Sequence, residues 1–134
     1  MNPRTIGSIA LRGAIVALAV GTAYIHFTLG GTIFVATAAG YVALALAMVA
    51  PLCIARDVRW LTRLALAGFA AGTIGAWFIQ GHPIFFQAVA AKTIEVALIG
   101  LIAVETYVEV GGPVAVARKF VNLGSRLVGA GAAA

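Results

Sequence analysis

The chain has 134 residues, of which 63% are hydrophobic and 10% are charged, and its formal net charge is +5. Soluble domains carry about 25% charged residues, so this composition excludes an ordinary soluble globular protein. The positive charge does not indicate nucleic-acid binding, because the basic residues flank apolar segments, where they orient helices in a membrane. Cys53 is the single cysteine, which excludes an internal disulfide and a cysteine metal cluster.

The first apolar run predicts a membrane span at residues 13–29, behind a basic N-terminal segment at residues 1–12. A basic leader before an apolar run also fits a signal peptide. No strong small-x-small cleavage site follows it, however, so we expect a retained span. The paired glycines Gly30 and Gly31 then predict a tight reversal of the chain.

A second span is expected at residues 33–54, with Pro51 in its last turn, where a break in the helix is tolerated. A charged loop is expected next, at residues 55–59. Trp60 follows at the predicted level of the lipid headgroups, and Arg63 is expected to extend back toward that level.

A third span is expected at residues 61–79 and a fourth at residues 84–110, joined by a short uncharged turn at residues 80–83. Because the connections are short, successive spans are antiparallel. The predicted fold class is therefore an all-α polytopic membrane protein, with a bundle of four antiparallel transmembrane helices over residues 13–110.

Residues 111–134 predict a basic amphipathic tail, which starts with a glycine stop and a proline. Its apolar and polar side chains fall on different helical stripes, namely Val116, Phe120, Leu123 and Leu127 against Arg118, Lys119, Asn122 and Arg126. This pattern is typical of a helix that lies in the membrane interface.

The distribution of charge predicts the orientation of the bundle. Every Lys and Arg except Lys92 lies beside the same ends of the expected spans, and the turns at residues 29–32 and 80–83 carry none. The positive-inside rule then places both termini in the cytoplasm, with the protein in the inner or plasma membrane.

Small residues recur at spacings that favour close packing of membrane helices. They are Gly13, Ala17 and Gly21 in the first span, Ala36 and Gly40 in the second, and Gly68 and Gly72 in the third. The sequence therefore predicts close helix–helix contacts at these positions.

Lys92 and Glu95 form the most informative pair, because ionisable groups are costly at membrane depth and usually find partners there. They are three residues apart on one helix and can pair. One hypothesis is a proton or cation relay, or a polar ligand site. The other is a buried pair that fixes helix register, which we favour because the other spans offer no further intramembrane carboxylate or lysine.

Glu105 and Glu109 share a wedge of the fourth span with Glu95, since successive residues of a helix are about 100° apart. The wedge could form a proton exit path toward the cytoplasm. We favour the simpler interpretation, in which both carboxylates meet the headgroup region and the basic groups Arg56, Arg59 and Arg118.

His26 and His82 lie at similar predicted depth, so they could bind a metal or haem. We favour a hydrogen-bonding role for His26 near Lys92 or Gln87, because the sequence offers no third strong ligand. Tyr24 lies in the same polar end of the first span and is a further ligand or proton-path candidate. No cofactor is implied by the sequence.

Several fragments, taken in order, resemble a family of small uncharacterised prokaryotic four-span membrane proteins with the pattern IHxxLG, GY, RW, WxxxG and KxxEVAL. They are AYIHFTLGG at 23–31, AAGYVALALA at 38–47, VRWLTRLALAG at 58–68, TIGAWFIQG at 73–81 and KTIEVALIGLIAVE at 92–105. The resemblance implies four spans and marks His26, Trp77, Lys92 and Glu95. It implies no activity.

The sequence contains no phosphate-binding loop, nucleophile elbow or metalloprotease motif, which argues against an enzyme. We expect an accessory or structural subunit of a larger integral membrane complex, such as a respiratory or photosynthetic one, with other membrane subunits or itself as partner. An alternative is a small homo-oligomeric proton- or cation-coupled transporter or channel subunit using Lys92 and Glu95. A weaker alternative is metal or haem binding through His26 and His82.

Overall fold

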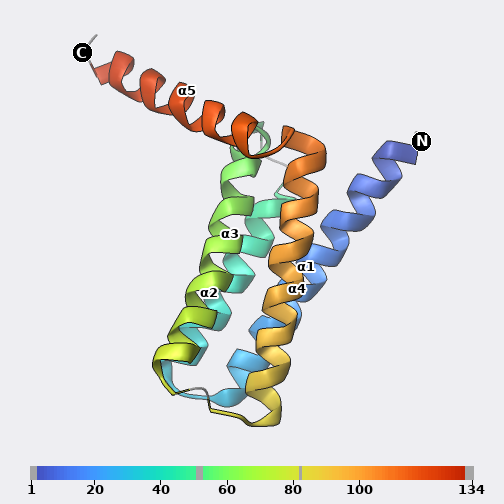
Figure 1. Ribbon diagram of the computed structural model, residues 1–134, viewed down its shortest axis with the longest axis vertical. Coiled ribbons are helices and arrows are strands. Elements are labelled where there is room, and N and C mark those ends of the chain that lie inside the picture. The colour runs from blue at the N-terminus through green and yellow to red at the C-terminus, as the bar shows by residue number, and fades with distance from the viewer. Residues whose placement is uncertain (1–2, 51–52, 82, 132–134) are drawn as a thin grey trace.

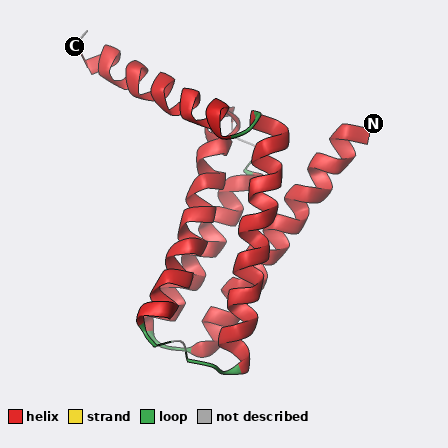
Figure 2. Cartoon of the chain, viewed as in Figure 1, coloured by secondary structure: helices red, strands yellow, loops and turns green. Residues whose placement is uncertain are grey.

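The computed structural model describes residues 3–50, 53–81 and 83–131, and its elements in these ranges are helices (Figure 2). They are α1 (Pro3–Leu29), α2 (Thr32–Val49), α3 (Cys53–Ile79), α4 (Phe86–Val110) and α5 (Pro113–Gly131). The first four helices, α1 to α4, are long and apolar enough to cross a membrane. The predicted fold class, a polytopic bundle with an amphipathic C-terminal helix, is confirmed.

The four spans run alternately up and down, and each packs against two neighbours in the ring order α1, α2, α3, α4 (Figure 1). The α1–α2 and α3–α4 connections lie together at one end of the bundle, which we call the turn end. The other end, which we call the terminal end, carries the start of α1 and the helix α5, which runs across the bundle axis. The ring leaves a central axis onto which all four helices can direct side chains.

The boundary between the second and third spans differs from the prediction. Helix α2 ends at Val49 rather than near residue 54, and the expected loop at residues 55–59 lies within α3. The cause is Pro51, because a residue that precedes proline is driven out of the helical region. Ala50 accordingly has an extended conformation, with φ −54° and ψ 128°.

The connections follow the glycine signals. Gly30 and Gly31 have φ angles of 71° and 83°, which side chains with a Cβ rarely adopt, and they reverse the chain between α1 and α2. At the end of α4, Gly111 caps the helix in the left-handed conformation, and its amide donates a hydrogen bond to the Tyr107 carbonyl.

Buried positions recur every three or four residues along each helix, as expected for a stripe that faces a bundle axis. They are Ile15, Ala19, Thr22 and His26 on α1, Ala38, Tyr41, Ala45 and Met48 on α2, Arg63, Leu66 and Ala70 on α3, and Ala91, Glu95, Leu98, Ile102 and Glu105 on α4. Large hydrophobic side chains such as Phe27, Leu46 and Val96 are exposed on the outside. Lipid as the surrounding solvent explains this apolar exterior around a partly polar interior.

Only some of the predicted small-residue contacts form within this chain. A Cβ built on Gly40 would lie 2.6 Å from Cζ of Phe69, so the absence of a side chain there lets α2 and α3 approach. A Cβ on Gly13, Gly21, Gly68 or Gly72 would meet nothing within 4 Å. Those four glycines therefore make no such close contact with the described residues, and Ala17 and Ala36 are exposed.

Two residues near the start of α3 are more buried than the sequence predicts. Arg63 is 2% exposed, and its side chain points into the bundle toward Glu105 and Glu109. Trp60 is also buried, and its ring meets Phe120 of α5 edge to face at a centroid distance of 4.8 Å. Phe120 of α5 therefore touches the terminal end of α3 at Trp60.

Candidate functional site

The predicted pairing of Lys92 and Glu95 is confirmed. Lys92 Nζ donates a hydrogen bond to Glu95 Oε2 over 2.6 Å, between residues that lie on the same side of α4. The Glu95 side chain is completely buried, whereas that of Lys92 keeps 14% of its surface exposed. The pair therefore joins a buried carboxylate to a partly accessible ammonium.

The other Glu95 oxygen is bound by two further helices. Oε1 accepts hydrogen bonds from the Thr22 hydroxyl of α1 at 3.3 Å and from the Tyr41 hydroxyl of α2 at 3.0 Å. His26 Nε2 lies 3.6 Å from the same oxygen. One carboxylate of α4 thus links α1 and α2 to α4. A buried charge needs several such partners, because burial removes its hydration.

The tautomer of His26 follows from its neighbours. Its Nδ1 lies 2.8 Å from the Thr22 carbonyl oxygen, and a carbonyl only accepts, so Nδ1 carries a hydrogen. In the neutral ring Nε2 is then an acceptor facing Glu95. His26 Nε2 is therefore a close neighbour of the Glu95 carboxylate, at 3.6 Å, just beyond hydrogen-bond distance.

Helix α3 joins this network through Thr73. The Thr73 hydroxyl lies 3.0 Å from the Tyr41 hydroxyl and is the donor there, because Tyr41 gives its one hydrogen to Glu95. The Ala70 carbonyl oxygen also lies 2.8 Å from the Thr73 hydroxyl. All four spans therefore contribute to what we call the polar core, which comprises Thr22, His26, Tyr41, Thr73, Lys92 and Glu95.

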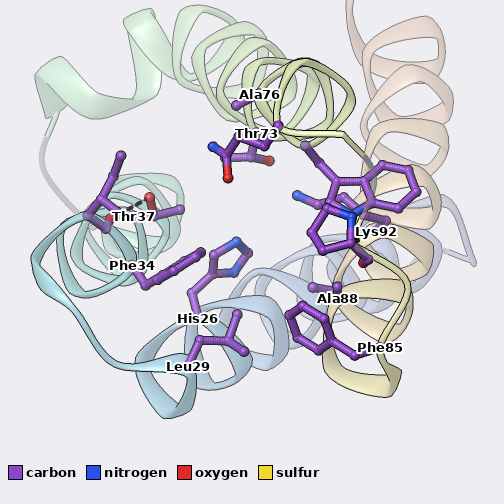
Figure 3. A pocket seen from close by; sticks show the side chains of 14 residues that line it. His26, Leu29, Phe34, Thr37, Thr73, Ala76, Phe85, Ala88 and Lys92 are labelled. Carbon is purple, nitrogen blue, oxygen red and sulfur yellow. Dashed lines mark hydrogen bonds between the residues drawn. The ribbon is translucent and has the colours of Figure 1, made fainter.

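A pocket of about 140 Å³ opens beside the polar core, at the turn end of the bundle. Figure 3 shows His26 of α1, Phe34 of α2, Thr73 of α3 and Lys92 of α4 around the same space. Its remaining walls are mainly apolar and include the Trp77 indole. The polar core thus forms the floor of a pocket that would otherwise be an apolar cavity.

A second group of charges lies at the terminal end. Arg12 of α1 contacts Glu105 at 3.2 Å and Glu109 at 2.8 Å, and Arg63 of α3 contacts the same two carboxylates. The Ser8 hydroxyl also donates to Glu109 at 2.7 Å. We call these five residues the terminal-end cluster. Arg12 and Arg63, which the prediction did not name as partners of these carboxylates, thus contact both of them, and the side chain of Arg56 lies outside the described residues.

An apolar layer separates the polar core from the terminal-end cluster. Between Glu95 and Glu105 the inward residues of α4 are Leu98 and Ile102, which are 0% and 2% exposed. The two carboxylates are ten positions apart, or about 15 Å along a helix. Ile15, Met48 and Leu66 fill the same core from the other spans. The wedge of carboxylates predicted as a proton path is therefore interrupted by packed hydrocarbon.

Two of the predicted site residues lie away from the polar core. Tyr24 is 69% exposed and lines a groove on the outer side of α1 and α2. Gln87 is exposed near the start of α4 and does not line the pocket. His82 lies outside the described residues. Within those residues, no group of three or more His, Cys, Asp or Glu side chains is arranged to hold a metal.

The chain was compared with protein families, curated proteins and solved structures. No protein-family model, no curated protein and no solved structure matches the chain. The resemblance to a family of four-span membrane proteins stays a prediction.

Sequence reasoning missed Thr22, Tyr41 and Thr73, because hydroxyl side chains are common in membrane helices and carry no motif. A signal was present nevertheless. Thr22 is seven residues after Ile15, and Thr73 is seven after Leu66, so a heptad count from the apolar core positions places both on the bundle axis.

Proposed function

We propose that this chain is a non-catalytic subunit of a larger integral membrane complex, of an energy-converting kind, and that its polar core holds a small ligand or proton. The observation that carries the proposal is the pocket, which has Lys92 and His26 in its lining and Glu95 beneath them. Intramembrane ionisable groups beside a cavity mark ligand sites and proton relays.

A one-ended site fits this geometry better than a pore. The pocket reaches the polar core from the turn end, and the layer of Leu98 and Ile102 lies below it. A conducting path needs water or polar groups along its length, and this layer presents packed side chains instead. A subunit that binds or exchanges at one side of the membrane is therefore the better match.

Membership in an assembly is supported by the outer surface. Gly13, Ala17 and Gly21 form a strip of small residues on α1, in which a Cβ on either glycine would meet nothing within 4 Å among the described residues and Ala17 is exposed. Strips of small residues favour close approach of membrane helices, because backbones can pack directly. The described chain also has little mass beyond the four spans, since α5 and short turns make up the rest.

Native mass spectrometry of the protein, extracted from its own membrane in mild detergent, tests the assembly. We expect it to be recovered with other membrane subunits or as an oligomer of itself. Gly21→Leu should weaken this association, while Val20→Leu, a change at the exposed neighbouring position, should not. Recovery of the wild-type chain only as a monomer would contradict the proposal.

Coupled transport of a proton or cation is a second candidate. It is favoured by the contact of one buried carboxylate, Glu95, with both an imidazole and an ammonium, since such groups form proton relays. In proteoliposomes it predicts proton or cation flux that Glu95→Gln abolishes. Absence of flux through the wild-type protein would remove this candidate and leave the subunit proposal standing.

We propose an inner or plasma membrane location with both termini in the cytoplasm. The basic side chains Arg12, Arg63, Arg118 and Lys119 belong to the terminal end, whereas the turn-end connections carry none. The positive-inside rule supports this orientation. The pocket then faces the side of the membrane away from the cytoplasm.

A further inference from the structure

We infer that the pocket binds the ring of a neutral, lipophilic carbonyl compound of the 1,4-benzoquinone class. This inference rests on the proposed ligand-holding role of the polar core and names the class of ligand. Four properties of the pocket lead to it: its size, its aromatic walls, the apolar rim around its mouth, and the balance of charge at its floor.

The volume of the pocket matches a ligand with a single six-membered ring. The pocket volume is about 140 Å³, and an apolar cavity of about 150 Å³ accommodates benzene. Phe34, Trp77 and Phe85 line it from α2, from α3 and from the residue before α4. Aromatic side chains contact a planar ring favourably in stacked or edge-on geometry. A six-membered planar ring therefore fits both the volume and the walls.

The rim favours a ligand that arrives from lipid. Ile33 and Phe85 line the pocket and remain 68% and 41% exposed, and the adjoining Ile84 and Phe86 are each 85% exposed. Apolar side chains at this level belong in the leaflet rather than in water. These side chains, which lie beside the exposed Gln80 of the same lining, give a lipophilic tail an apolar approach to the pocket.

The floor favours a neutral acceptor. The hydrogens of the Thr37 and Thr73 hydroxyls are engaged by the carbonyls of Ile33 and Ala70 at 2.8 Å or, for Thr73, by Tyr41, so these hydroxyls donate nothing to a ligand. Lys92 is the donor, because an ammonium has three hydrogens, and its hydrogen bond to Glu95 uses one of them.

The charge on Lys92 is already balanced by Glu95, whose Oε2 lies 2.6 Å from its Nζ. A ligand carboxylate or phosphate would add a second negative charge beside the same ammonium, at a cost in this low-dielectric site. A carbonyl oxygen accepts the hydrogen bond without that cost. The ring should therefore present a carbonyl toward Lys92 and direct its tail to the rim.

Fluorescence of Trp77 provides the test. The chain has two tryptophans, and the other, Trp60, lies at the terminal end against Phe120, so Trp60→Phe leaves a reporter in the pocket wall. The purified full-length protein in lipid nanodiscs is titrated with a decyl-substituted 1,4-benzoquinone. We expect saturable quenching, with at least tenfold weaker binding of the two-ring 1,4-naphthoquinone.

A matched pair of variants separates binding from partition into lipid. Ala76 is exposed and lines the pocket, so Ala76→Leu fills space without disturbing the core and should weaken binding at least tenfold. Ala71 is exposed on the same helix outside the pocket, and Ala71→Leu should leave the affinity within twofold. Lys92→Gln should weaken binding at least fivefold.

Non-saturating quenching, or equal affinity of the Ala76→Leu and Ala71→Leu variants, would overturn the inference. Benzoate is titrated in parallel, so that an error in the ligand class can be distinguished from the absence of a ligand site. If benzoate binds saturably and the quinone does not, the ligand class is wrong while the ligand-holding role stands. If neither binds, the ligand-holding role proposed for the polar core fails together with the inference.

Discussion

Arg63 of α3 and Glu105 of α4 form an ion pair that is almost completely excluded from solvent, with side-chain exposures of 2% and 1% and an Nε–Oε2 distance of 3.0 Å. These two atoms lie outside hydrogen-bond geometry, so their contact is electrostatic, while an Arg63 terminal nitrogen donates to Glu105 Oε1 at 3.0 Å. Arg12 approaches Glu105 from α1. Three helices therefore meet at one buried carboxylate, as three also do at Glu95.

Replacement of Arg63 tests how much this meeting point stabilises the bundle. Arg63→Met leaves Glu105 buried with Arg12 alone and should cost about 3–5 kcal/mol, the usual effect of breaking a buried pair. Arg63→Lys should recover part of the loss, since an ammonium keeps the charge but not the forked geometry. Equilibrium unfolding in mixed micelles measures both.

Arg118→Met is the control for Arg63, because Arg118 is exposed on α5. It should change the free energy of unfolding by no more than about 0.5 kcal/mol, as surface substitutions usually do. Equal effects of the Arg63 and Arg118 substitutions would show that the ion pair does not hold the helices together.

Substitutions of Lys92 and of Glu95 should lower the free energy of unfolding by different amounts. Lys92→Met leaves the fully buried Glu95 without its cation and should cost about 3–5 kcal/mol. Glu95→Gln should cost less, because the amide oxygen still accepts from Thr22 and Tyr41 and the partly exposed Lys92 can be hydrated at the pocket.

The double substitution of Lys92 and Glu95 should be more stable than Lys92→Met alone, because it removes the uncompensated charge. Thr93→Val is a control on the same helix, since Thr93 is exposed and its hydroxyl bonds the Val89 carbonyl of its own helix. Thermal unfolding in one detergent ranks the four proteins. A double variant less stable than both singles would contradict the assigned pair.

Gly40→Ala should destabilise the contact between α2 and α3 by about 1–3 kcal/mol, the range for overpacking. The new Cβ would lie 2.6 Å from Phe69 Cζ, and the Phe69 ring contacts the Tyr41 ring at 4.9 Å. Phe69→Leu should restore stability to the Gly40→Ala protein. Gly72→Ala is the matched control, since its Cβ would meet nothing within 4 Å.

Thiol labelling tests the orientation of the bundle in a Cys53→Ser background. Thr32→Cys, beside the α1–α2 turn, should react with a membrane-impermeant maleimide in intact cells. Ser125→Cys on α5 should react only after the membrane is opened. Reaction of both sites in intact cells, or the reverse pattern, would refute the assignment of both termini to the cytoplasm.

The elements of this fold could be predicted from sequence more completely than its contacts. Apolar runs and glycine turns predicted the four spans, and the three-residue spacing predicted the pairing of Lys92 with Glu95. Arg63 was misplaced, because an arginine near a span end fits snorkelling as well as burial. Its heptad relation to the buried Ala70 is the feature that decides in favour of burial.

The glycine positions show a second limit of sequence reasoning. Gly40 and Gly72 have the same local signal, a small residue four positions after another, yet one faces Phe69 and the other faces outward. Local spacing identifies a smooth face but not the rotation of the helix in the bundle, which depends on all its neighbours. Tyr41 escaped prediction for the same reason, since its partner Glu95 is far away in sequence.

Glu95, Glu105 and Glu109 all belong to α4, which is the last of the four spans to leave the ribosome. A nascent chain that ends after α3 carries Arg12 and Arg63 without their acidic partners, and Thr22, His26 and Tyr41 without the carboxylate that they surround. Delivery of the final helix to the translocon supplies those partners together, at two levels of the bundle. Biogenesis is therefore completed by one late insertion event, and chains stalled before it present unmatched cations that membrane quality control can recognise.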